Sequence, residues 1–356
     1  MGPSSSADTA TSRAESSFRA ITAGRIYSTR RHLFGPRHWL RRRAYENLWP
    51  FADAWSATGT LTSLDRQSRA ASVLASFFEG LAAYHGDGGS ALVGPEPVGF
   101  ESSVVAPLGG GGEVYFDDNT WLGLALMAHH ELGDERALPL ARRLFAFVTS
   151  GWSSDASWSH PGGIRWKQPV SNRSRNTCSN GPAAELAVLI HNATGDETAL
   201  EWSVRIYDWV RSALLGPDGL YVDQIAPDGT LRKEIWSYNQ GTMIGAGVLL
   251  HRSTGDETYL TEAIVTAGAS VSRFSLPVLL SQDAAFNAVF FRNLFLLDQL
   301  SPDPGYRRLA LAYADEMWAG HRDRRTGLFG GGRSVLNNSA PLVEIYALLA
   351  GAPPHA

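Results

Sequence analysis

The sequence predicts an all-α protein, an (α/α)6 barrel in which six inner helices are ringed by six outer helices. A short segment recurs along the chain, and its glycines, Gly133, Gly195 and Gly255, are 62 and 60 residues apart. An apolar helical pattern precedes each copy, and a more amphipathic pattern follows it. Periods of this size mark repeat architectures. One inner and one outer helix per sixty residues gives about six pairs in 356 residues.

Each copy of the segment has the chemistry of a turn between two helices. The copies are Leu132–Leu138, Thr194–Leu200 and Thr254–Leu260, each with Gly-Asp-Glu at its centre. Glycine supplies the left-handed residue that ends a helix. Aspartate then caps the next helix, and glutamate stands in its first turn, where the helix dipole favours negative charge.

The elements follow in order along the chain. Six segments are apolar on most faces and are expected to be buried, namely 43–57, 118–131, 181–192, 240–252, 284–299 and 339–349. Five amphipathic outer partners are expected at 64–84, 135–150, 197–213, 257–273 and 304–318, and the sixth must come from residues 13–28. Strand-like alternation is scarce, with short hairpins indicated at 219–222 and 225–231.

The N-terminal part of the chain differs from the rest. Residues 1–12 are rich in Ser, Ala and Thr and are expected to form a disordered tail. Residues 13–43 carry nine arginines and one acid, and are expected to form a helix that packs on the acidic remainder of the chain. A nucleic-acid-binding arm is the alternative. No linker divides the chain after residue 60, so residues 13–356 are predicted to form a single domain.

The composition excludes several kinds of site. The one cysteine, Cys178, rules out a disulfide or a multi-thiolate zinc site within the chain. The histidines have no ligand spacing, so no metal and no cofactor are expected. No stretch approaches the ~18 apolar residues of a membrane span. Thr29-Arg30-Arg31 is faintly similar to a twin-arginine signal, but no apolar region follows. A cytoplasmic monomer without a nucleic-acid partner is therefore predicted.

Polar residues gather where the predicted inner helices begin. In the barrel these helices run the same way, so their N-termini meet at one end, where the dipoles add positive potential. The segments there are Tyr115–Asn119, Arg175–Gly181, Trp236–Gly241 and Ser281–Asp283. Short hydrogen-bonding groups beside aromatic rings suit a carbohydrate. A nucleotide is disfavoured, because the Gly109–Gly112 run lacks the GK[ST] ending of a phosphate loop.

Asp117 and Asp118 are adjacent at one of these helix starts. Such carboxyls can lie roughly 5–6 Å apart, close to the separation that a retaining glycosidase uses. One would attack the anomeric carbon, and the other would protonate the leaving oxygen. Ordinary helix capping is the alternative interpretation of the two aspartates alone. The polar clusters at the other helix starts favour the interpretation that the two aspartates are catalytic.

The segment Tyr115-Phe116-Asp117-Asp118-Asn119-Thr120-Trp121 resembles the catalytic segment of glycoside hydrolase family 76, the α-1,6-mannanases. Four further pieces follow in that family's order. They are Gly162–Trp166, Asn176–Pro182, Trp236–Gly241 and Phe286–Arg292. The resemblance covers roughly residues 45–350. It departs from the family at Arg165, where a second aromatic residue is usual.

The resemblance implies a retaining, endo-acting hydrolase of α-1,6-linked mannose, with a mannan or a mannose-containing oligosaccharide as its carbohydrate substrate. Asp117 would be the nucleophile and Asp118 the acid/base. The residues expected to bind substrate are Asn119, Arg165, Trp166, Asn180, Trp236, Tyr238, Asn239, Gln240 and Arg292. Because Arg165 stands where the family usually has an aromatic residue, its guanidinium would recognise an anionic or substituted glycan.

Three other functions compete with this one. A glycan-binding protein without activity could share the fold. A sugar 2-epimerase uses the same barrel with histidines as acid and base, but no inner-helix start carries a well-placed histidine. A terpene cyclase requires a third acid, which the Asp117–Trp121 segment lacks.

Overall fold

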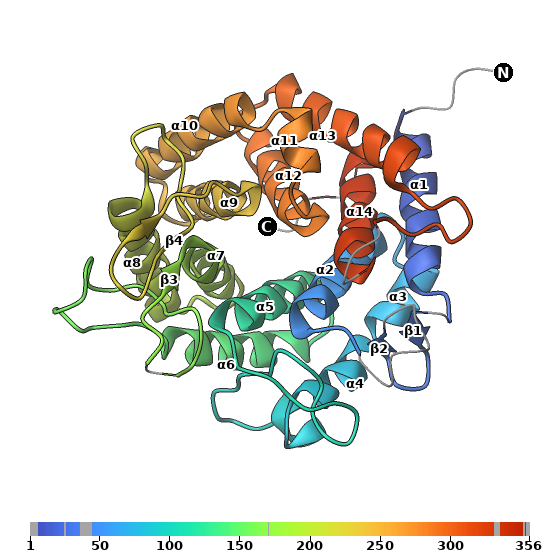
Figure 1. The fold of residues 1–356 in the computed structure, drawn as a ribbon, viewed down its shortest axis with the longest axis horizontal. Helices are drawn as coiled ribbons and strands as arrows, with labels where there is room; N and C mark the ends of the chain where they lie inside the picture. The colour runs from blue at the N-terminus through green and yellow to red at the C-terminus, as the bar shows by residue number, and fades with distance from the viewer. Residues whose placement is uncertain are drawn as a thin grey trace.

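The computed structural model describes residues 6–24, 26–35, 45–169, 171–330, 335–351 and 353. Within this part of the chain, six inner helices form a closed ring in the order α2, α5, α7, α9, α12 and α14 (Figure 1). Their bounds are Leu48–Leu64, Phe116–Glu131, Thr177–Thr194, Ser237–Thr254, Ala284–Asp298 and Val335–Leu349. Each packs against its neighbours in the ring, and α14 closes the ring on α2. The predicted (α/α)6 barrel is confirmed.

A second layer of helices surrounds the ring. The outer helices are α1 (Ser6–Ile21), α6 (Ala137–Thr149), α8 (Glu197–Leu214), α10 (Glu257–Arg273) and α13 (Pro304–Glu316), which a π-helical turn, η3 (Met317–His321), extends. A short helix, α11 (Leu276–Leu280), links α10 to α12. Each of these five outer helices packs on an inner one, and α1 lies along α14, as the expected sixth outer partner.

The outer helix expected over residues 64–84 is broken. It consists of α3 (Arg69–Leu74), α4 (Phe77–Leu81) and the 3-10 turn η1 (Ala82–Tyr84), and a second 3-10 turn, η2 (Gly88–Leu92), follows. The break is at Ser76, whose hydroxyl donates to the carbonyl of Val73 at 2.7 Å. A serine that bonds back to its own turn competes with the helical ladder, and here the helix divides.

The predicted turn chemistry is present at all three repeats. Gly195 and Gly255 end α7 and α9 with φ of 72° and 73°, the left-handed region that favours glycine. The side chains of Asp196 and Asp256 then accept hydrogen bonds from the backbone N–H groups of Thr198 and Thr258. At the third repeat Gly133 has a φ of 99°, and Asp134 Oδ1 accepts from the backbone N–H of Arg136 at 3.0 Å. The Asp134 carboxylate also binds the side chains of Arg136 and His129, as described below.

The structure corrects the expectations for the N-terminal segment. Residues 1–12 were expected to be disordered, but α1 begins at Ser6, because Ala10 and Ala14 face the barrel and are buried. The helix expected over residues 13–43 ends at Ile21, and β1 (Tyr27–Ser28) and β2 (Leu33–Phe34) form an antiparallel pair. Residues 36–44 lie outside the described residues. Arg13 pairs with Asp315 of α13, and its guanidinium lies 5.3 Å from the Trp318 ring centre.

One small sheet stands at the end of the barrel where the inner helices begin. Its strands are β3 (Arg175–Asn176), β4 (Gln224–Ile225) and β5 (Leu231–Arg232), all antiparallel, and β4 lies in the middle. The β4–β5 hairpin falls at the second position indicated by the sequence, 225–231. This sheet brings the segment before β4 next to the start of α7, where the backbone N–H of Thr177 donates to the carbonyl of Asp223 at 2.9 Å.

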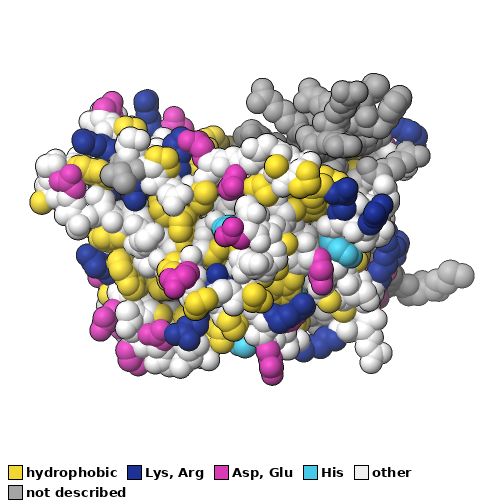
Figure 2. Space-filling model, turned by 90° about the horizontal axis from the view of Figure 1, so that it is seen from below, with side chains coloured by type: hydrophobic (Ala, Val, Ile, Leu, Met, Phe, Trp, Pro, Cys, Tyr) yellow, Lys and Arg dark blue, Asp and Glu magenta, His cyan; other side chains and the backbone are white. Residues whose placement is uncertain are grey.

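Acidic and basic side chains are interspersed over the flank of the barrel that Figure 2 shows. No helix in the described part of the chain is both long enough and apolar enough to cross a membrane.

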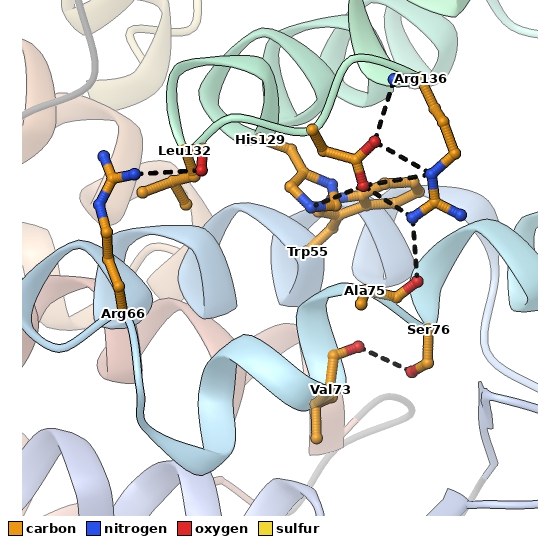
Figure 3. A network of polar contacts seen from close by, with 9 residues as sticks. Trp55, Arg66, Val73, Ala75, Ser76, His129, Leu132 and Arg136 are labelled. Atoms are coloured by element: carbon orange, nitrogen blue, oxygen red, sulfur yellow. Dashed lines mark hydrogen bonds and ion pairs between the residues drawn. The ribbon is translucent and has the colours of Figure 1, made fainter.

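The opposite end of the barrel has a buried network around His129 (Figure 3). The indole N–H of Trp55 donates to His129 Nδ1 at 3.2 Å, so the ring proton lies on Nε2, which is 3.4 Å from the Asp134 carboxylate. Arg136 binds the same carboxylate at 2.7 Å. Burial is the main cause that lowers the pKa of His129 to about 4. His129 thus has a packing role, as an acceptor and donor between two helices.

We expect this network to make stability depend on pH. The folded pKa of His129, about 4, lies below the unfolded value of 6.5. The contribution is therefore fully present above about pH 6.5 and is lost as the pH falls toward 4, by up to roughly 3 kcal/mol. Denaturant unfolding at several pH values would measure it. In a His129→Gln variant, the free energy of unfolding should no longer fall by this amount between pH 6.5 and 4. The same pH dependence in the variant as in the wild type would show that His129 is not its source.

Candidate active site

A cleft of about 830 Å³ lies at the end of the barrel where the inner helices begin. Its walls come from the starts of α2, α5, α7, α9, α12 and α14 and from the small sheet. The lining residues that carry the argument below are Asp117, Asp118, Cys178, Asp223 and Asp283, together with the aromatic residues Trp49, Tyr115, Trp121, Trp166, Trp236, Tyr238 and Phe286. The convergence of helix starts expected from the repeat is therefore present.

Asp117 stands in the first turn of α5 and has one bound and one unbound carboxylate oxygen. Its Oδ2 accepts from the indole N–H of Trp166 at 3.1 Å and from the thiol of Cys178 at 3.6 Å. Its Oδ1 is buried and has no hydrogen-bond partner among the described residues. Two side-chain donors thus fix the orientation of this carboxylate.

Trp166 reaches Asp117 because its own segment runs beside the start of α5. The backbone N–H of Phe116 donates to the carbonyl of Trp166 at 2.9 Å, and that of Gln168 donates to the carbonyl of Val114 at 3.0 Å. Tyr115 packs on the Trp166 ring with centroids 5.1 Å apart. These strand-like contacts join segments about fifty residues apart in the chain, and sequence periodicity does not reveal such a pairing.

The two adjacent carboxyls have different acidities. Burial raises the pKa of Asp117 to about 6, and the hydrogen bonds from Trp166, Cys178 and the first-turn backbone hold it from rising further. Burial raises the pKa of Asp118 well above its usual value, and the negative charges of Asp117 and Asp53 add to this shift. Asp117 is therefore the stronger acid of the two and the first to ionise as the pH rises. Environments that separate two carboxyl pKa values assign the roles of base and acid.

Aromatic rings from four inner helices form one wall of the cleft, called here the aromatic wall (Trp49, Trp121, Trp236, Tyr238 and Phe286). Tyr238 stacks on Phe286 with centroids 4.0 Å apart at an interplanar angle of 11°. Trp49 stacks on the same ring at 5.8 Å, and Trp236 meets it edge-on at 5.8 Å. Large, fixed ring faces suit the apolar faces of sugar rings.

Three amides that were expected to bind substrate hold loops instead. Asn119, Asn180 and Gln240 are fully buried, do not line the cleft, and each is the fourth residue of its inner helix. Each side-chain oxygen accepts from a backbone N–H of the preceding loop, and each amide nitrogen donates back to the carbonyl of that same loop residue. The loop residues are Phe100 (2.7 and 3.0 Å), Ile164 (2.7 and 3.0 Å) and Tyr221 (2.8 and 2.8 Å), respectively.

These three contacts, called here the amide clamps, correct the expected placement. The remaining donor of each amide goes to the backbone carbonyl four residues earlier in the chain, at 2.7–3.1 Å. Since an amide offers one acceptor and two donors of this kind, the clamps leave little capacity for a sugar hydroxyl. They position the loops, including the one that carries Trp166.

We expect loss of a clamp to affect stability first. An Asn180→Leu substitution leaves the N–H and C=O of Ile164 without partners, which should lower the free energy of unfolding by about 2–4 kcal/mol. The exposed Asn192→Leu is the matched control, with an expected effect below about 0.5 kcal/mol. Denaturant titration of both variants measures the difference. An Asn180 variant of wild-type stability with only a raised KM would instead favour direct sugar binding.

The other predicted residues are distributed as follows. Trp166, Trp236 and Tyr238 line the cleft as expected. Arg165 does not, because its guanidinium donates to the carbonyls of Gly151 and Gln168 on its own side of the loop. Asn239 is fully buried behind the cleft wall, in contact with Asp223.

Arg292 is also absent from the cleft. It lies deeper in the barrel, where Nη1 pairs with Glu344 at 2.8 Å and donates to the Ser56 hydroxyl at 3.2 Å. Arg292 was placed at the site because its motif begins at Phe286, which does line the cleft. It stands six residues further along α12, more than one and a half helical turns below it.

Several lining residues were not among the predicted site residues. Cys178 and Asp283 lie in the segments recognised at the helix starts, and the equivalence of these starts could have selected them. Phe286 begins one of the pieces that resemble family 76. Trp49 and Asn47 were missed because α2 was expected to begin five residues too early. Asp223 and Gln224 come from the sheet, for which the sequence carries no comparable signal.

No group of three or more His, Cys, Asp or Glu in the described residues could hold a metal ion.

The family model described as Glycosyl hydrolase family 76 matches residues 102–322 of this chain, more than half of its length. The chain belongs to glycosyl hydrolase family 76. The resemblance drawn from the sequence motifs is thereby confirmed. The match includes the aspartate pair, the Trp166 loop, the small sheet and most of the aromatic wall.

Curated relatives of this family 76 protein bear names of one activity. The chain is 27% identical over 214 residues to mannan endo-1,6-alpha-mannosidase DCW1 of Saccharomyces cerevisiae, and 27% identical over 216 residues to the Candida glabrata protein of the same name. Each match covers 52% of this chain and 47% of the relative. The matched part thus spans about half the length of these relatives.

Solved structures of family 76 have the same fold. The GH76A alpha-1,6-mannanase from Salegentibacter sp. HEL1_6 is 26% identical in sequence to this chain. The two structures superpose with a TM-score of 0.77, over 96% of this chain and 99% of that one. An inactive variant of that enzyme, in which two consecutive aspartates are replaced by asparagine, is described in complex with alpha-1,6-mannotriose, at 25% identity and a TM-score of 0.76. Bt3792 from Bacteroides thetaiotaomicron shares the fold at a TM-score of 0.79 with 22% identity.

Proposed function

We propose that this family 76 protein is an endo-acting, retaining α-1,6-mannanase with Asp117 as nucleophile and Asp118 as acid/base. The observation that carries the proposal is the pair itself: two adjacent carboxyls on the cleft, of which Asp117 is held by two side-chain donors and Asp118 has a pKa raised well above its usual value. The linkage and the endo mode are supported by the names of the relatives. The consecutive aspartates replaced in the inactive mannanase variant agree with the roles given to this pair.

The first step forms a bond between Asp117 and the sugar. The Asp117 carboxylate attacks the anomeric carbon of one mannose, while the C1–O6 bond to the next mannose breaks. Asp118 delivers its proton to the departing O6, so the leaving sugar departs as a neutral alcohol. Trp166 and Cys178 keep Oδ2 in place during the attack, so little reorientation of the carboxylate is needed.

The second step returns the protein to its starting state. Asp118, now a carboxylate, takes a proton from water, whose oxygen attacks the same anomeric carbon and displaces Asp117. The pKa of Asp118 falls when the Asp117 charge is neutralised by the covalent bond and rises again when that charge returns. One water is consumed in each cycle, and the product keeps the anomeric configuration of the substrate.

The experiment is incubation with α-1,6-mannobiose through α-1,6-mannohexaose, with chromatography of the products over time. Internal cleavage of the longer oligomers is expected, with α-1,2- and α-1,3-linked oligomers of equal length left intact. Release of mannose alone from one end would contradict the endo mode. Binding of the oligomers by calorimetry without any turnover would establish the alternative, a glycan-binding protein on this fold.

A further inference from the structure

The cleft carries more negative charge than the proposed reaction uses. Four aspartates line it, and no lysine, arginine or histidine stands among its described lining residues. Asp117 and Asp118 perform the chemistry, whereas Asp223 and Asp283 have no part in it. They come from separate elements, the segment before β4 and the residue before α12.

Among the described residues that line the cleft, no cation stands beside either of these two carboxylates. Asp283 stands at the N-cap of α12 but makes no capping hydrogen bond with its side chain. Burial, followed by the charge of Glu234, raises the pKa of Asp223 to about 6, so the carboxyl is ionised at neutral pH. Both therefore contribute negative charge to the cleft.

Three cations close to Trp166 in the sequence are occupied elsewhere. Lys167 contacts both carboxylate oxygens of Glu113, at 2.7 and 2.8 Å. Arg165 donates to two loop carbonyls, as described above. Arg175 is buried and donates to the carbonyls of residues 159, 160 and 162. None of these three side chains lines the cleft.

We infer that the cleft accepts uncharged α-1,6-mannosyl segments and rejects segments that bear an anionic substituent such as phosphate, with Asp223 and Asp283 as the specificity-determining residues. This inference rests on the proposed function, and it reverses the role expected for Arg165 from the sequence. An anionic group in the cleft would lose water and meet carboxylates, with no compensating cation among the described lining residues. With an effective dielectric near 20 and separations of about 6–8 Å, repulsion of this kind corresponds to at least about a 30-fold loss in kcat/KM.

The test compares three forms of α-1,6-mannotetraose. One is unsubstituted, one carries phosphate on O2 of an internal mannose, and one carries a neutral acetyl group at the same oxygen. We expect kcat/KM for the phosphorylated form to be at least about 30-fold below that for the acetylated form. Raising the salt concentration from 0.05 to 0.5 M should narrow this ratio several-fold, because screening shortens the range of the repulsion.

Charge-neutral variants assign the effect to residues. Asp223→Asn and Asp283→Asn should each lower the ratio of kcat/KM for the acetylated form to kcat/KM for the phosphorylated form at least threefold. Asp208→Asn, on the exposed face of α8, should leave this ratio unchanged. A general loss of activity in a variant lowers kcat/KM for both substrates by the same factor and therefore does not change their ratio. Equal kcat/KM for phosphorylated and acetylated forms, or a ratio insensitive to salt and to both variants, would overturn the inference. Failure to cleave the unsubstituted form would instead remove the proposed function.

Discussion

Replacing Asp117 by asparagine is expected to lower kcat on α-1,6-mannotetraose by about four orders of magnitude or more, because an amide cannot form the glycosyl bond. The side chain keeps its shape and can still accept from Trp166, so stability and KM should change little. Reducing-end assays over long incubations measure the residual rate. An Asp117→Asn protein with more than about 1% of wild-type kcat would contradict the role of nucleophile.

Asp118→Asn tests the other role and separates it from the first. Loss of the proton donor should lower kcat on the tetraose by about 10³- to 10⁴-fold. A substrate with an aryl leaving group that needs no protonation should still release its phenol in a rapid first turnover with Asp118→Asn. The same substrate should give no such burst with Asp117→Asn. Identical behaviour of the two variants would show that the roles are not divided as proposed.

Replacing Arg292 by methionine is expected to lower the free energy of unfolding by about 3–5 kcal/mol. Arg292 and Glu344 are 9% and 3% exposed, and the substitution leaves the Glu344 carboxylate buried without its cation. Burial raises the pKa of the neighbouring Glu185 to about 8, so that carboxyl is already neutral at pH 7. The penalty therefore falls mainly on Glu344.

The double variant Arg292→Met/Glu344→Gln provides the control. Removing both charges should recover most of the lost stability, because a neutral amide replaces the unpaired carboxylate. Thermal unfolding of the wild type, the two single variants and the double variant forms a double-mutant cycle, which measures the interaction between Arg292 and Glu344. If Arg292→Met leaves stability unchanged but raises KM for mannotetraose, Arg292 contacts the sugar as the sequence resemblance implied.

The helical ring was predictable because its signals are local. Gly195 and Gly255 each end a helix and precede a capping aspartate, so the repeat fixes where inner and outer helices alternate. The positions of Asp117, Trp236 and Tyr238 on the cleft follow from the same alternation, since each lies at the start of an inner helix.

The amide clamps show where sequence reasoning fails. Asn180 and Gln240 have the residue type and the helix position of sugar-binding groups, but their partners are the backbones of Ile164 and Tyr221. Only the path of the loops decides whether an amide at a helix start meets a ligand or a loop. The same limit hid Asp223, because its place on the cleft depends on the pairing of β3 with β4.

The most direct test of the central claim is the configuration of the first product. Proton NMR of mannotetraose hydrolysis, recorded within the first turnovers, observes the anomeric signal of the newly formed reducing end before mutarotation. Double displacement through Asp117 requires the α-anomer first, with the β-anomer appearing only later by mutarotation. Immediate appearance of the β-anomer would mean direct attack by water, and the assignment of Asp117 as nucleophile would be wrong.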